Sequence, residues 1–329
     1  MKKVTILIPE TAVIEAIADP HYMFKAVNQF LIAMGKEPLF QVQLVGLSQE
    51  VKLENGLYSV HCEKLIAEVE QTDLIFIPAL SGDMKEALKK NQAFLPWIVN
   101  QHRNGAEIAS LCIGAFLLAE TGLLNGKKCS THWNSGNEFR EMFPQVELVD
   151  GSIITEENGI YSSGGANSYW SLLLYLVEKY TNRDTAILAS KFFAVDIDRT
   201  SQAAFMLFEG QKNHGDVEIL KAQFYIEENF QEKMTVESLA NHVALGRRSL
   251  ERRFKKATNN SVLEYIQRVK IEAAKRSFET NQKQINEVMY DMGYSDSKAF
   301  RTLFKKNTGL TPVEYRNKYS KNALEKISA

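Results

Sequence analysis

Two short segments of the chain, fifty residues apart, carry nearly the same pattern of charged and aromatic residues. The first is ERRFKKAT, residues 251–258, and the second is RTLFKKNT, residues 301–308. Each follows a short apolar stretch of helical periodicity and a turn. A helix, a tight turn and a second helix form a helix-turn-helix unit. The repeat therefore predicts two such units in the last third of the chain.

The pattern of this C-terminal region is helical throughout. Apolar residues recur at the 3.6-residue spacing of amphipathic helices, and polar residues suited to capping separate them. We find no convincing strand pattern beyond residue 216. The sequence predicts an all-α fold class with helices at 217–229, 236–243, 248–257, 262–278, 285–292, 298–306 and 312–319.

The first ~210 residues have a different pattern, in which short apolar runs alternate with helical stretches. The runs predict strands at 4–8, 41–46, 74–78, 107–111 and 160–163, and the stretches predict helices at 26–34, 93–105, 114–121 and 167–180. Such alternation is typical of a flavodoxin-like α/β fold, a mainly parallel sheet with helices on both faces. In these sheets the functional crevice lies at the carboxyl ends of the strands.

Length and charge both favour two domains. A chain of 329 residues is long enough for about two domains. We expect an α/β domain at 1–208, a polar, glycine-containing linker at 209–216 and a helical domain at 217–329. Residues 215–329 contain 21 Lys and Arg against 15 Asp and Glu, although the whole chain has a net charge of −1. This local excess of positive charge indicates a polyanionic partner.

The second helix of each unit carries the basic residues. Residues 246–257 include six basic side chains and one acidic one, and 298–306 include four basic side chains and no acid. Such a helix fits the major groove of DNA and neutralises phosphates, while Phe254 and Phe304 would anchor it to a core. The helix at 262–278 would be about 25 Å long, so it can hold two reading helices near one DNA turn apart. The alternative is that these are solvated faces of an ordinary bundle.

Residues ~216–320 resemble the DNA-binding domain of the AraC/XylS family of transcription regulators. Leu239-Ala240, the FKK motifs at 254–256 and 304–306, MGYSD at 292–296 and Thr311-Pro312 carry the resemblance. It implies base contacts from Arg248, Glu251, Arg252, Ser297, Lys298, Arg301 and Thr302. Arg247, Lys255, Lys256, Lys305 and Lys306 are better suited to phosphate.

Two of these positions leave alternatives open. Glu251 could accept a hydrogen bond from cytosine N4, or it could be an intrahelical partner of Lys255. Thr302 stands where many members of the family have a basic residue, which implies weaker reading by the second helix.

Cys112 lies between an expected strand and an expected helix, in EIASLCIGAF at 107–116. A nucleophile on such a turn is exposed, and the helix dipole favours its thiolate. His132 follows twenty residues later, so the pair raises the question of a thiol hydrolase. The alternatives are a ligand pocket built on the same crevice, or a packing role for Cys112.

Most of residues 1–190 resemble the class I glutamine amidotransferase-like domain of ThiJ/PfpI type. LCIGAFLLAETGLLNG at 111–126, THW at 131–133 and YSSGGA at 161–166 carry the resemblance. Several positions depart from the enzymes: Ile113 replaces a His, Ala16 stands at the carboxylate position beside Glu15, and ALSG at 79–82 replaces a Gly-Gly pair. We therefore expect a ligand crevice with Cys112 and His132 as vestigial catalytic residues. Its expected ligand-binding residues are Glu15, Gly82, Cys112, Ile113, His132, Trp133, Gly164 and Gly165.

The sequence as a whole predicts a transcription regulator that reads a DNA sequence and senses a small metabolite, and that is not an enzyme. No cofactor or metal is expected, because the remaining histidines lack metal-ligand spacing. The expected partners are double-stranded operator DNA, a small effector, a second copy through the N-terminal domain and RNA polymerase. The resemblance implies amino acids or quaternary amines as effectors. Three sparse cysteines and no apolar run of spanning length indicate a cytoplasmic protein without a membrane anchor.

Two rival functions remain open at this point. One is a thiol-dependent hydrolase or glyoxalase-like enzyme fused to a DNA-binding domain. The other is a protein that coats DNA without sequence preference.

Overall fold

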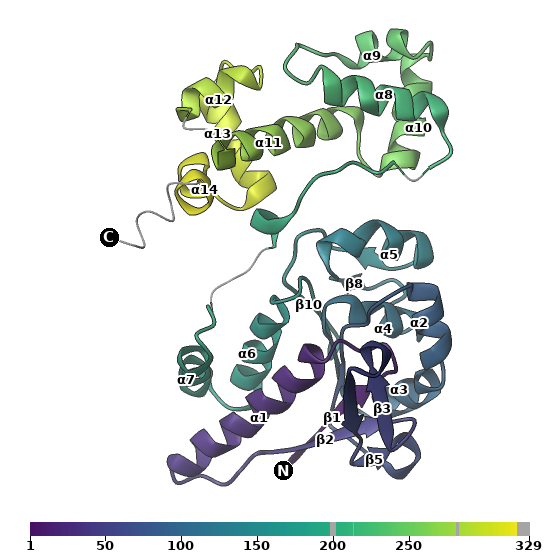
Figure 1. The fold of residues 1–329 in the computed structure, drawn as a ribbon, viewed down its shortest axis with the longest axis vertical. Helices are drawn as coiled ribbons and strands as arrows, with labels where there is room; N and C mark the ends of the chain where they lie inside the picture. The colour runs from purple at the N-terminus through teal and green to yellow at the C-terminus, as the bar shows by residue number, and fades with distance from the viewer. Residues whose placement is uncertain (198–201, 213, 281–282, 321–329) are drawn as a thin grey trace. The chain divides into compact units, whose positions relative to one another are not determined.

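The computed structural model describes residues 1–197, 202–212, 214–280 and 283–320 (Figure 1). The chain divides into two compact units, Met1–Gln202 and a second unit that begins at Ala203. This division lies before the expected domain end at 208 and the expected linker at 209–216. The reason is that the second unit binds this segment: Lys275 Nζ donates to the carbonyl of Met206.

A seven-stranded sheet forms the centre of the first unit. Its strands lie in the order β10-β11-β7-β6-β1-β2-β5, and all neighbours are parallel except β10 and β11. The order β2-β1-β6-β7-β11 is the flavodoxin-like one, so the predicted fold class is confirmed. The strands are Lys2–Ile8 (β1), Phe40–Gly46 (β2), Lys64–Leu65 (β5), Leu74–Ile77 (β6), Glu107–Ser110 (β7), Ile154–Glu157 (β10) and Ile160–Ser163 (β11).

Helices cover both faces of this sheet because its central strands are apolar on both sides. In β1, the buried side chains of Val4, Ile6 and Ile8 join one core and Leu7 joins the other. The first core includes α1 (Glu15–Ala33), α6 (Tyr169–Tyr180) and α7 (Arg183–Phe193); the second includes α2 (Met84–Asn91), α3 (Phe94–Arg103), α4 (Ala115–Glu120) and α5 (Gly136–Met142) (Figure 1).

Several elements of this unit do not follow from the sequence pattern. Helix α1 begins well before the expected residue 26, since Pro20 lies inside it and proline normally marks a helix end. Helices α2, α5 and α7 are also additional. So are the short strands β3 (Glu50–Leu53), β4 (Tyr58–His61), β8 (Lys128–Cys129) and β9 (Glu147–Leu148), which pair outside the main sheet.

The second unit is all-α, as predicted. Its helices begin and end within two residues of the expected bounds, at Val217–Glu228 (α8), Val236–His242 (α9), Arg247–Thr258 (α10), Val262–Thr280 (α11), Ile285–Asp291 (α12), Ser297–Thr308 (α13) and Pro312–Tyr319 (α14). Across the described parts of both units, no helix has the length and apolar character that a membrane span requires.

Helix α11 is shared by two copies of one arrangement. The N-terminal part of α11 packs with α8, α9 and α10, and its C-terminal part packs with α12, α13 and α14 (Figure 1). In each copy a buried phenylalanine meets a tyrosine edge-to-face: Phe254 with Tyr265 at 5.2 Å, and Phe304 with Tyr315 at 5.4 Å between ring centroids. The hydroxyl of Tyr265 donates to Glu227 on α8, and the hydroxyl of Tyr315 donates to Glu279 on α11. The 19 residues of α11 form a rod of about 28 Å between the two.

Candidate nucleic-acid interface and ligand crevice

Each helix-turn-helix unit turns at one residue with positive φ. Ala244 between α9 and α10 has φ 53°, and Gly293 between α12 and α13 has φ 75°. A Cβ at Gly293 would lie 2.7 Å from the carbonyl oxygen of Gln231, so only glycine fits there. Since Gln231 follows α8 and Gly293 belongs to the second copy, this close approach also fixes the two copies against each other.

Helix α10 presents basic side chains opposite its core face. Leu250, Phe254 and Thr258 are buried and lie on one side of the helix. At about 100° per residue, the opposite side carries Arg248, Arg252, Lys255 and Lys256, and all four are exposed. A partner could therefore reach these residues without disturbing the core.

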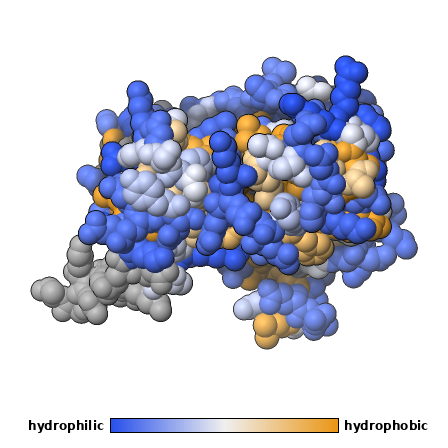
Figure 2. All heavy atoms as spheres, turned by 90° about the horizontal axis from the view of Figure 1, so that it is seen from above, coloured by the Kyte–Doolittle hydropathy of each residue, from blue (hydrophilic) through white to orange (hydrophobic). Residues whose placement is uncertain are grey.

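Helix α13 repeats this register fifty residues later. Phe300, Phe304 and Thr308 are buried, in the places of Leu250, Phe254 and Thr258. The exposed residues are Lys298, Arg301, Thr302, Lys305 and Lys306, and Ser297 is half-buried at the first position of the helix. Figure 2 looks onto the C-terminal unit and shows hydrophilic side chains over most of that face, with small hydrophobic areas between them.

Two expected contact residues of α10 pair with each other. Arg247 Nε donates to Glu251 Oε1 at 3.2 Å, one helical turn apart. Lys255 Nζ instead donates to the carbonyl of Asn259 at 2.8 Å. The alternative that Glu251 pairs with Lys255 is thus wrong in its partner, because Arg247 offers a guanidinium on the same side of the helix.

Arg253 is bound to two carboxylates on another helix of the unit and at its cap. Its guanidinium donates to both carboxylate oxygens of Asp216, at 2.8 and 2.5 Å, and to Glu218 at 2.7 Å. The hydrogen bond from Arg253 lowers the pKa of Asp216. Asp216 also caps α8 by accepting from the amide of Ile219, so Arg253 fastens α10 to the start of α8.

In the first unit, Cys112 occupies a strained turn between β7 and α4, with φ 54°. Its amide donates to Ser163 Oγ at 3.2 Å, and its carbonyl accepts from Thr131 Oγ1 at 3.1 Å. Only 4% of the residue is exposed, and burial raises the pKa of the thiol to about 12. The expectation of an exposed thiol is wrong here, because the fold buries Cys112, and the effect of burial on its pKa exceeds that of the backbone hydrogen bond at Ile113, which lowers it.

His132 does not form a nucleophile–base pair with Cys112. It is half-buried, which lowers its pKa, and its Nδ1 accepts from the amide of Asn134 at 3.2 Å. Its ring lies 5.5 Å from that of the half-buried Trp133, centroid to centroid. Among the residues that the structure describes, no hydrogen bond joins His132 to Cys112 or to a carboxylate.

One carboxylate of α1, Asp19, was not predicted as a site residue from the sequence. Ala16 is fully buried and Glu15 is exposed in the first turn of α1. Asp19, one turn further on, accepts from the hydroxyl of Tyr169 at 2.6 Å. Burial is the main cause that raises the pKa of Asp19, and the charge of Glu15 adds to it. Asp19 lies three residues after Ala16, on the same face of the helix, and this spacing could have indicated it as the carboxylate of the site.

The remaining expected ligand residues lie in different surroundings. Gly164 and Gly165 follow β11 and are buried; Ile113 is half-buried; Gly82 is exposed in the loop after β6, with φ 83°. Cys112, Ser163 and the glycine pair are thus together at the carboxyl ends of β7 and β11. In the described ranges, neither Glu15 nor Gly82 hydrogen-bonds to them, and no cluster of His, Cys, Asp and Glu could hold a metal ion.

Both units match known families. Residues 2–179 match the model of the DJ-1/PfpI family, and residues 239–318 match a helix-turn-helix domain. The chain belongs to the DJ-1/PfpI family. Its second unit is an AraC-type helix-turn-helix domain, so both predicted resemblances are confirmed.

Relatives of this DJ-1/PfpI chain cover both units. The HTH-type transcriptional regulator ArgR of Pseudomonas aeruginosa is 25% identical over 257 residues, which are 78% of this chain and 74% of that protein. The HTH-type transcriptional regulator GlxA of Rhizobium meliloti is 24% identical over 285 residues, 85% and 86% of the two chains. The solved structure of a ThiJ/PfpI family protein from Pseudomonas syringae shares the fold, with a TM-score of 0.50 at 17% identity over 74% of this chain and 90% of that one.

Proposed function

We propose that the chain is a transcription regulator that reads a double-stranded operator and senses a small metabolite in its N-terminal unit. The observation that supports DNA reading is the repeated register of α10 and α13. Both helices expose basic residues opposite a buried Phe, and both are fixed to the same rod, α11. The relatives ArgR and GlxA are named as transcriptional regulators, which agrees with this role.

The proposed contacts divide into two kinds. Arginine reads guanine by two parallel hydrogen bonds, and lysine meets phosphate as a point charge. The proposed base contacts are Arg248, Glu251, Arg252, Ser297, Lys298, Arg301 and Thr302, and the proposed phosphate contacts are Arg247, Lys255, Lys256, Lys305 and Lys306. Because Glu251 is paired with Arg247, it can contact a base only if DNA competes with this pairing for Glu251 or for Arg247.

The salt dependence of DNA binding tests this proposal. An operator is first found by footprinting genomic DNA with the full chain, and its affinity is then measured by fluorescence anisotropy. If about six phosphates are neutralised, log affinity falls with log salt at a slope near −5. A regulator also prefers its operator to unrelated DNA by about 10³-fold or more. A slope near zero would contradict the phosphate contacts, and equal affinity for all sequences would favour a DNA-coating protein.

We further propose that the N-terminal unit binds its ligand without converting it. Two observations support this: burial raises the pKa of the Cys112 thiol, and no base among the described residues is hydrogen-bonded to it. The test is incubation of the pure chain with methylglyoxal and with thioester or amide substrates. Turnover that disappears in Cys112→Ala would instead favour the thiol-dependent enzyme.

We also propose that two chains pair through the N-terminal unit. Tyr22 on α1 and Phe192 on α7 are 55% and 52% exposed, and their rings meet edge-to-face at 6.3 Å. Exposed aromatic groups that cluster on neighbouring helices are typical of an interface. Sedimentation should show a dimer that Phe192→Ser weakens. The proposed compartment is the cytoplasm, and RNA polymerase is the proposed further partner of a regulator bound at a promoter.

A further inference from the structure

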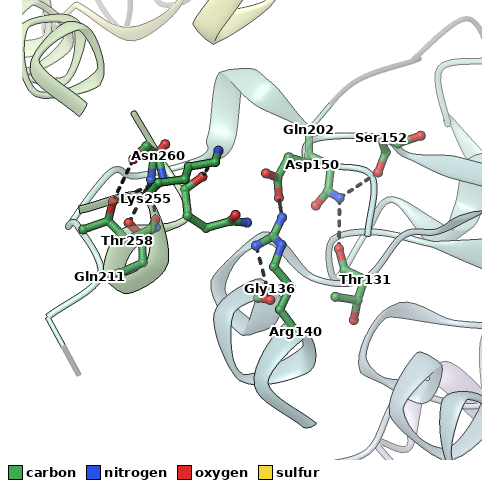
Figure 3. Close-up of polar contacts among 11 residues, drawn as sticks. Thr131, Gly136, Arg140, Asp150, Ser152, Gln202, Gln211, Lys255, Thr258 and Asn260 are labelled. Atoms are coloured by element: carbon green, nitrogen blue, oxygen red, sulfur yellow. Dashed lines mark hydrogen bonds and ion pairs between the residues drawn. The ribbon is translucent and has the colours of Figure 1, made fainter. Parts of the chain in front are cut away.

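The last residue of the N-terminal unit, Gln202, has its side chain buried in that unit. Only 2% of it is exposed. Its Nε2 donates to the carbonyls of Thr131 at 3.1 Å and Ser152 at 2.8 Å, and its own amide donates to the carbonyl of Gly151 at 2.8 Å. Figure 3 shows the carboxamide held between the two carbonyls. The chain end of this unit therefore inserts a polar group among backbone acceptors.

The glycine pair after β11 makes room for this carboxamide. A Cβ at Gly164 would lie 1.6 Å from Nε2 of Gln202, and a Cβ at Gly165 would lie 3.1 Å from its Oε1. Thr131 connects the same place to Cys112, because its Oγ1 donates to the carbonyl of Cys112. Gln202 thus lies at the carboxyl ends of β7 and β11, the edge at which parallel sheets bind ligands.

One atom of this side chain has no hydrogen-bond partner in the part of the chain that the structure describes. Oε1 of Gln202 is buried and accepts no hydrogen bond among the residues that the structure describes. Exchanging the positions of the amide oxygen and nitrogen would not satisfy this group, because Oε1 would then face the two carbonyl acceptors that now receive hydrogen bonds from Nε2. Gln101, another buried glutamine of the unit, donates to the carbonyls of Val69 and Glu70 and also accepts from the amide of Thr72. The carboxamide of Gln202 therefore lacks the accepted hydrogen bond that the carboxamide of Gln101 has.

We propose that Gln202 occupies the effector's own subsite and that the effector displaces it. This inference rests on the proposed function and names the chemistry of its ligand site. The subsite consists of two convergent carbonyls, of Thr131 and Ser152, above a glycine pair that offers no side-chain bulk. Such a site takes a group with at least two N–H donors, as in a primary amide, a primary ammonium or a guanidinium group. It rejects a quaternary ammonium, which has no N–H to donate.

The position of Gln202 in the chain makes its release a signal. The C-terminal unit begins at the next residue, Ala203, and holds the segment that follows: Glu272 accepts from the amide of Phe208 at 3.2 Å, and Gln223 Nε2 donates to the carbonyl of Gln211 at 2.8 Å. Asn260 donates to the side chain of Gln211 at 3.0 Å (Figure 3). The anchor at Gln202 is therefore adjacent in the chain to the C-terminal unit. Displacing Gln202 releases the end of the N-terminal unit directly before the first residue of the C-terminal unit.

The subsite is tested in the full chain with propionamide as the probe, since it reproduces the side-chain amide of glutamine. In Gln202→Ala, propionamide at about ten times its Kd should raise the melting temperature by about 3 °C or more. N,N-dimethylpropionamide has no N–H and should not raise it. Equal shifts with both amides, or none with either, would overturn the subsite. Should Gln202→Ala not fold, Gln202→Ser also removes the carboxamide and gives the same comparison.

The signal is tested by operator affinity. Gln202→Ala should change the affinity by about five-fold or more, and the control Gln101→Ala should leave it unchanged. If both variants bind like the wild type, the switch is refuted while the regulator stands. If no chain binds DNA with sequence preference, the proposed function fails, and the propionamide test still decides the subsite.

Discussion

The buried ion pair of α11 offers a direct test of how the C-terminal unit is held together. Lys275 Nζ lies 2.8 Å from Glu272 Oε2, and the two side chains are 3% and 8% exposed. The pair also binds the backbone of Met206 and Phe208. Lys275→Met leaves the carboxylate buried without its counter-charge, which costs about 3–5 kcal/mol. With a urea m-value of about 2 kcal/mol/M for a unit of this size, the midpoint should fall by about 2 M.

The assay can separate the two units because all three tryptophans, Trp97, Trp133 and Trp170, lie in the first one. Lys275→Met should move the transition seen by circular dichroism at 222 nm and leave the tryptophan fluorescence transition in place. The double variant Glu272→Leu with Lys275→Met should regain most of the loss, since an apolar pair is often as stable as a buried ion pair. Lys283→Met, which breaks the exposed pair with Asp291, is the control and should shift neither transition. A loss below ~1 kcal/mol in the single variant would refute the reasoning.

Three further predictions concern the sites. Arg252→Ala should reduce the preference for the correct base at one position of the operator by about 1–3 kcal/mol of binding free energy. Lys256→Ala should weaken binding to all DNA sequences alike and reduce the slope of log affinity against log salt by about 1. The reverse pattern in competition anisotropy would exchange the roles of the two residues. Because burial raises the pKa of Cys112 to about 12, its thiolate is scarce below that pH, and iodoacetamide at pH 8 should alkylate it roughly 10³-fold more slowly than a free cysteine; fast labelling in peptide mass spectrometry would contradict the burial. Gly164→Ala should lower the melting temperature of the wild type but hardly that of Gln202→Ala, since a Cβ there would lie 1.6 Å from Nε2 of Gln202; equal losses would place the clash elsewhere.

The C-terminal unit follows closely from the sequence because its determinants are local. Apolar residues at helical spacing define the buried faces, and short polar motifs define the ends. Thr235 and Thr311, for example, cap α9 and α14 by accepting from amides three residues on. Even the exposed register of α10 and α13 could be inferred, since it is simply the side opposite the two phenylalanines.

The crevice of the N-terminal unit could be predicted only in part, because its partners are distant in sequence. Gln202 meets the carbonyl of Thr131 across 71 residues, and Tyr169 meets Asp19 across 150. No periodicity or spacing reports such pairs. The glycine pair was visible in the sequence as a motif, but the reason for a glycine at 164 was not. Gln202 fills the space that a side chain at 164 would need. The protonation of Cys112 also depends on burial by the whole fold, whereas the strand-to-helix turn alone suggested a thiolate.

The repeated unit separates the two kinds of proposed DNA contact by comparison within one chain. The copies share their core register, so each exposed position of α10 has an equivalent fifty residues later in α13. The lysines at 255 and 256 recur as lysines at 305 and 306, whereas Glu251 and Arg252 become Arg301 and Thr302. Phosphates are the same at every step of a duplex, while the two half-sites of an operator can differ in their bases. The lysines that stay constant between the copies are therefore suited to phosphate, and Glu251 and Arg252, which change, are suited to bases. On the proposed contacts, we expect the two helices to meet different base sequences and the same kind of phosphate, so an operator for one chain need not be a repeat.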